Sequence, residues 1–95
     1  MKLKELAKIG TNMKNADFWL VRKGTPNVLG TPTKHFSEEH IGIKVTSDKV
    51  LPDFLFYAME FVKSGGYWHR HHYGTLRLKH IRVNDVKNLE VGMTY

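Results

Sequence analysis

The chain has 95 residues, 15 of them Lys or Arg and 9 of them Asp or Glu, so its formal net charge is +6. This length suits one domain with one core, and an apolar fraction of 41% excludes a globally disordered chain. The absence of cysteine excludes disulfides and thiolate metal sites. The positive charge favours an anionic partner, either nucleic acid or membrane head groups.

Neither a membrane anchor nor a secretory signal is expected. No apolar run approaches the ~20 residues that cross a bilayer. The basic N-terminal segment lacks the continuous apolar region of a signal peptide. The sequence therefore predicts a cytoplasmic protein that does not bind membranes.

The first third of the chain predicts one helix and one confident strand. Apolar residues at roughly helical spacing predict a short helix over residues 1–9, ended by Gly10. Residues 16–22 predict a strand with both faces buried. Residues 23–27 then predict a turn, and a further short strand is expected around Leu29.

The middle of the chain predicts a strand over residues 41–45 and the main helix over residues 51–63. A polar connection over residues 35–40 precedes the strand. Pro52 suits the first turn of the helix, and the glycines after Ser64 end it. The apolar stripe of this helix consists of Phe54, Leu55, Ala58, Met59, Phe61 and Val62.

The last third predicts a loop and then short elements. Residues 75–83 form one bent strand or two short pieces with a turn near His80, anchored by apolar side chains. A helical turn over residues 85–88, with Asn84 as its N-cap, and a short strand over residues 89–91 follow. The anchoring side chains are Leu76, Leu78, Ile81 and Val83.

These elements predict an α/β fold of the α+β type over residues 1–95, as a single domain. It consists of a small mixed sheet of short twisted strands, one main amphipathic helix over residues 51–63, and short terminal helical turns.

Residues 65–83 combine glycines, aromatics, histidines and Lys/Arg with no carboxylate. Such a segment suits a polyanion, because cations neutralise phosphates and polar side chains donate to phosphates or base edges. A solvated basic loop on an ordinary domain is the alternative. The predicted DNA contacts of this segment are Arg70, His71, His72, Tyr73, Thr75, Arg77, Lys79 and Arg82.

The turn over residues 23–27 is a second candidate site. A glycine turn at a strand end presents backbone N–H groups and Lys23 to a phosphate, with Thr25 and Asn27 beside it. It lacks the length and the Gly-Lys-Ser/Thr ending of a nucleotide-binding P-loop. A plain hairpin turn is the alternative.

The order of these motifs resembles a target recognition domain of the specificity subunit of type I restriction–modification enzymes. The motifs are the Arg22-Lys23-Gly24 turn, the Pro-led aromatic helix over residues 52–62, and the Ile-containing strand with its helical turn over residues 80–89. The resemblance implies sequence-specific binding of double-stranded DNA without catalytic activity. Since the long spacer helices of that family are missing, we expect a stand-alone module from a phage or mobile element, or part of a longer chain.

Other functions remain open from the sequence. The module could instead modulate a restriction or methylation complex by binding a methyltransferase or nuclease subunit, with Phe56 and Tyr57 as its contact patch, and it could form a homodimer. A zinc site at His69, His71 and His72 is disfavoured by neighbouring arginine and by the lack of cysteine. A His-dependent nuclease would need a carboxylate motif for magnesium, and none is recognisable. No cofactor, metal or catalytic residue is therefore predicted.

Overall fold

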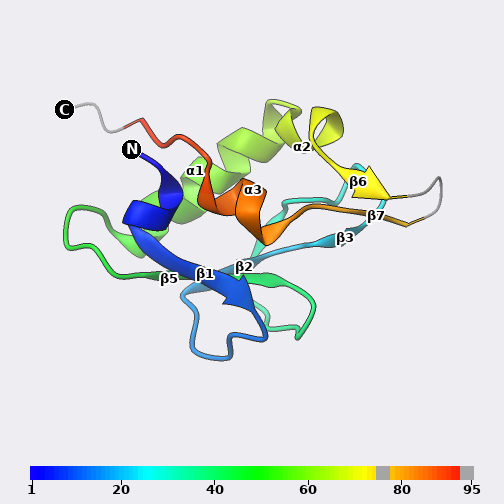
Figure 1. The fold of residues 1–95 in the computed structure, drawn as a ribbon. Coiled ribbons are helices and arrows are strands. Elements are labelled where there is room, and N and C mark those ends of the chain that lie inside the picture. The colour runs from blue at the N-terminus through cyan, green and yellow to red at the C-terminus, as the bar shows by residue number, and fades with distance from the viewer. Residues whose placement is uncertain (75–77, 93–95) are drawn as a thin grey trace.

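The computed structural model describes residues 1–74 and 78–92. The fold is of the α+β type, as the sequence predicts (Figure 1). The strands of this part form two antiparallel sheets, rather than one small mixed sheet. Thr75, Leu76 and Arg77 lie outside the described residues.

The larger sheet forms one side of the hydrophobic core. Its strand order is β1 (Ala7–Thr11), β5 (Ile41–Val45), β2 (Phe18–Leu20) and β4 (Pro32–Thr33). All three residues of β2 are buried, which confirms the prediction of a strand with two covered faces. The predicted strand over residues 41–45 is also confirmed.

The prediction of a helix over residues 1–9 is wrong. A 3₁₀ helix covers only Leu3–Glu5, and the chain then extends as β1, which pairs residue by residue with β5. Ala7 and Ile9 are buried and Lys8 is exposed, so the apolar residues also fit the two-residue period of a strand. A terminal helix of two turns is only marginally stable by itself, whereas the five-residue ladder joins β1 to the rest of the sheet.

The expected strand around Leu29 is displaced. Leu29 is fully buried but belongs to a turn, and the strand that follows is β4, paired with β2. Gly30 has φ +75°, a left-handed conformation that favours glycine. The chain needs this turn to bring Leu29 into the core before β4 begins.

The main helix α1 covers Pro52–Ser64, close to the prediction. Leu55 and Met59 are its buried residues, and the predicted stripe is wrong for Phe54 and Phe61, which are 47% and 81% exposed. Of the predicted contact patch, Tyr57 is exposed, whereas Phe56 is half-buried, with its ring centre 5.4 Å from that of Phe18. The helix is apolar around most of its circumference, so the sequence pattern alone does not say which side the sheet covers.

The smaller sheet lies on the other side of the molecule from the β1–β5 end of the larger sheet (Figure 1). Its order is β3 (Lys23–Gly24), β7 (Lys79–His80) and β6 (Tyr73–Gly74). The predicted turn over residues 23–27 therefore begins as a strand. The loop expected after Gly66 begins as a short helix, α2 (Tyr67–Arg70).

Of the two alternatives for residues 75–83, the described residues 78–83 favour one extended strand over a turn near His80, because the Ile81 amide continues the pairing by donating to the Arg22 carbonyl (3.0 Å). Ile81 is fully buried and Val83 packs against the core, which confirms two of the predicted anchors. Leu78 is 69% exposed, so that anchor is wrong. Leu78 and Ile81 are three residues apart and cannot share one face of an extended strand.

The C-terminal helical turn is present as α3 (Val83–Lys87), with Arg82 rather than Asn84 as its N-cap. The last predicted strand is reduced to a single bridge between Lys2 and Glu90, with Leu89 and Val91 buried. Within residues 1–74 and 78–92, no helix is long and apolar enough to cross a membrane.

Candidate nucleic-acid interface

The register of the smaller sheet brings Lys23, His80 and Tyr73 into one row. His80 pairs with Lys23 on one side and with Tyr73 on the other. Directly paired residues of antiparallel strands project to the same side of a sheet. Three side chains from distant parts of the chain therefore share one face.

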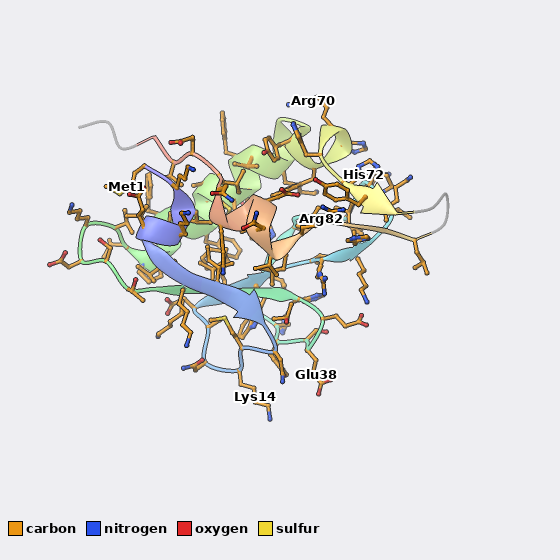
Figure 2. The ribbon with its side chains drawn as sticks, viewed as in Figure 1. Met1, Lys14, Glu38, Arg70, His72 and Arg82 are labelled. Atoms are coloured by element: carbon orange, nitrogen blue, oxygen red, sulfur yellow. The ribbon has the colours of Figure 1, made fainter. Side chains whose placement is uncertain are left out.

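Arg82 extends this row. Its guanidinium carbon lies 3.5 Å from the centre of the Tyr73 ring, a cation–π contact. The Tyr73 and His80 rings are 6.0 Å apart between centres. We name Lys23, Tyr73, His80 and Arg82 the basic–aromatic face. Lys23, Tyr73 and Arg82 are exposed and His80 is half-buried, so the face is accessible. Figure 2 labels Arg82 just before α3.

The next row of the smaller sheet consists of one lysine between two glycines. Lys79 pairs with Gly24 and Gly74, so it is the row's only side chain. Adjacent rows project to opposite sides of the sheet, so Lys79 projects away from the basic–aromatic face. Gly74 has φ +112°, and a Cβ there would overlap the carbonyl oxygen of Leu78. The close approach of β6 to β7 therefore requires glycine at this position.

The turn after β3 carries the other predicted contacts of this region. The Lys23 ammonium lies 3.4 Å from a carboxylate oxygen of Glu39, an exposed ion pair that costs little to separate. Thr25 and Asn27 are exposed, and the Thr25 carbonyl accepts a hydrogen bond from the Val28 amide. Both side chains can therefore contact a ligand that reaches Lys23.

Helix α2 holds Arg70 away from the row. The Arg70 guanidinium donates to the Gly65 carbonyl (3.2 Å) at the end of α1, and Figure 2 shows this side chain at the outer edge of α2. His71 stacks on Tyr67 with 4.2 Å between ring centres. The structure thus divides the predicted basic stretch between two elements.

The two histidines after α2 have a defined proton position. Nδ1 of His71 lies 2.9 Å from the Tyr67 carbonyl oxygen, and Nδ1 of His72 lies 2.8 Å from that of Trp68. A carbonyl oxygen only accepts, so each Nδ1 carries the hydrogen. Nε2 of each ring is then left to accept a hydrogen bond from a ligand.

Of the predicted contacts, the structure brings together Lys23, Tyr73 and Arg82 on one face. Thr25 and Asn27 lie in the adjacent turn, and Lys79 lies on the opposite side of the same sheet. Arg70, His71 and His72 belong to α2 or directly follow it. Thr75 and Arg77 lie outside the described residues.

His80 completes the face but is absent from the predicted contacts. Its position depends on pairing with residues 57 and 7 positions earlier in the chain. Strand alternation provides a partial signal, because Leu78, His80 and Arg82 are two residues apart and share one side of an extended strand.

Three comparisons, with models of protein families, with curated proteins and with solved structures, find no match for this chain. Among the described residues, no group of three His, Cys, Asp or Glu side chains could hold a metal ion.

Proposed function

We propose that this protein binds double-stranded DNA through the basic–aromatic face and the adjoining turn, as a recognition module without catalytic activity of its own. The observation that carries this proposal is the pairing of β3, β7 and β6, which places Lys23, Tyr73, His80 and Arg82 in one accessible row.

The chemistry of this row suits a duplex. Lys23 and Arg82 neutralise phosphates and release counterions, and the ring of Tyr73 holds the Arg82 guanidinium in place. In the major groove, Arg and Lys side chains can also reach the edges of guanine bases. Thr25 and Asn27 add neutral donors and acceptors beside the cations.

The resemblance to a type I target recognition domain supports the same proposal and adds sequence specificity to it. The Arg22-Lys23-Gly24 motif of that resemblance contributes β3, and the strand near His80 contributes β7. Under this proposal, the protein is a DNA-reading module of a restriction–modification system or of a phage or mobile element.

The test is an electrophoretic mobility shift with random-sequence duplexes at two salt concentrations. We expect wild-type protein to retard DNA at low salt. The Lys23→Ala/Arg82→Ala variant should bind at least about tenfold more weakly, and its slope of log affinity against log salt should be shallower by about 2.

The matched control is Lys8→Ala/Lys14→Ala, which removes the same charge from exposed positions elsewhere. It should keep most of the affinity if the basic–aromatic face is the binding surface. Absence of a shift by folded wild-type protein, or equal losses in the two variants, contradicts the proposal. Selection of bound sequences from a random duplex pool then tests specificity.

A further inference from the structure

Helix α1 presents an exposed apolar face that no described part of the chain covers. Its members are Leu51, directly before the helix, and Phe54, Tyr57 and Phe61, which are 73%, 47%, 66% and 81% exposed. The spacing of three and four residues places the three aromatics on one side of the helix. Large apolar patches of this kind mark interaction sites on small proteins. We name these four residues the α1 face.

The α1 face continues into a hollow beside the C-terminal segment. Between α1 and residues 88–92 lie two adjoining depressions of about 380 and 360 Å³. Phe61, Val62 and Glu90 line both of them, and Ala58 and Met59 add apolar wall to one. The surface is therefore a groove with an apolar floor rather than a set of scattered apolar residues.

Carboxylates flank this groove on both sides, although the chain as a whole carries +6. Asp53 and Glu60 are seven residues apart, so they flank the α1 face on one side, and Glu90 flanks the other. Asp53 lies 3.7 Å from Lys34, and Glu90 lies 3.2 Å from the N-terminal ammonium. Both are exposed pairs, which contribute little and yield readily to a new partner.

Besides Lys34 and the N-terminal ammonium, a third cation adjoins the groove at its far end. Arg70 lines the depression next to Tyr67, but its guanidinium already donates to the Gly65 carbonyl. Glu60 makes no ion pair within the described part of the chain. Glu60 is therefore open to a cation of a ligand, and Asp53 and Glu90 can exchange their exposed partners for cations of the same ligand.

From this geometry we propose that the α1 face docks an amphipathic helix of a partner protein, with an apolar stripe flanked by Lys or Arg. The helix lays its apolar side chains into the groove while its cations meet Asp53, Glu60 and Glu90. A 13-residue α1 is about 20 Å long, which matches three to four turns of a bound helix. This inference does not depend on DNA binding.

The area agrees with a helix as occupant. The four exposed side chains together offer on the order of 500 Å², which is enough for a transient interface of small size. A second copy of the chain is disfavoured, because pairing two α1 faces brings Asp53 and Glu60 of one copy against the acidic groove of the other.

The experiment uses two labelled 14-residue peptides with Leu at i, i+3, i+4 and i+7 positions, one with Lys and one with Glu elsewhere. Fluorescence anisotropy measures their binding to the full chain. We expect the Lys peptide to bind at least about tenfold more tightly. General attraction to a chain of charge +6 would give the opposite order, so the preference isolates the acidic groove.

Two variants locate the site. Tyr57→Ser/Phe61→Ser should weaken binding of the Lys peptide at least about tenfold without unfolding the protein, because both side chains are largely exposed. The matched control is Leu78→Ser, which removes an exposed apolar side chain beside β7 and should leave peptide binding unchanged. Glu60→Lys should weaken the Lys peptide and strengthen the Glu peptide.

Four outcomes overturn the proposal. The first two are no binding of either peptide and a preference for the Glu peptide. The third is equal binding of the Lys peptide by wild type and by the Tyr57→Ser/Phe61→Ser variant. The fourth is dimerisation of the wild type in sedimentation experiments that this variant abolishes. The last outcome would assign the face to a second copy. Mobility shifts with DNA are a separate readout, and we expect the variant to retain them.

Discussion

At the scale of single residues, the Trp68 side chain lies directly against the backbone of Gly30. Trp68, on α2, is 1% exposed, and its Nε1 has no hydrogen-bond partner in the described part of the chain. A Cβ at Gly30 would overlap the indole, and φ +75° is strained for any other residue. The turn before β4 and the helix before β6 therefore depend on one glycine.

We expect Gly30→Ala to lower the free energy of unfolding by about 2 kcal/mol or more, because strain in the left-handed region adds to overpacking against Trp68. Urea denaturation followed by circular dichroism measures this loss. Gly92→Ala is the control, since nothing lies within 4 Å of its added Cβ, and it should change stability by less than about 0.5 kcal/mol. Equal effects of the two substitutions would refute the contact.

At the scale of elements, α1 shows why an apolar pattern identifies a helix better than its buried side. The sequence predicts the helix from its spacing and its proline. It wrongly predicts that Phe54 and Phe61 are buried, because nearly every side of α1 carries an apolar residue. Only packing against the sheet determines that Leu55 and Met59 are the buried residues. Because α1 is apolar on two sides, one side packs in the core and the other, the α1 face, stays exposed.

Truncating each side of α1 should give different losses of stability. Leu55→Ala should cost about 3 kcal/mol in the free energy of unfolding, because it leaves a cavity in the core. Phe61→Ala removes more atoms but from an 81% exposed side chain, and should cost less than about 1 kcal/mol. Thermal or urea denaturation compares the two. Similar losses would mean that Phe61 packs within the core.

The sheets show a second limit of the sequence. Residues 16–22 and 41–45 are predicted as strands because they are apolar and bounded by turns. The strands β3, β6 and β7 are two residues each, too short for periodicity to reveal. The basic composition of the candidate site is readable, but the row of Lys23, His80 and Tyr73 exists only through register between distant segments.

At the scale of the whole molecule, the two candidate surfaces lie on different elements. The basic–aromatic face lies on the smaller sheet, while the acidic groove lies along α1 and residues 88–92. Under the two proposals, DNA and a basic helix bind at different places on the protein. Binding of one would leave the other accessible.

The bridge between Lys2 and Glu90 has a consequence for chain connectivity. The Met1 carbonyl accepts a hydrogen bond from the Val91 amide (2.8 Å), so positions 1 and 91 are neighbours in space. A short glycine linker from Gly92 to Met1 can therefore close the chain with little loop-closure entropy. We therefore expect the fold to depend on which segments pair, and not on where the chain starts.

A circular permutant joined in this way and opened between Asp48 and Lys49, in an exposed turn, should keep the far-ultraviolet circular dichroism of the parent. Its stability should fall by no more than about 2 kcal/mol. A permutant opened between Met59 and Glu60, inside α1, is the control and should not fold. Loss of structure in the first permutant would show that the covalent order of the segments, and not their contacts alone, specifies this architecture.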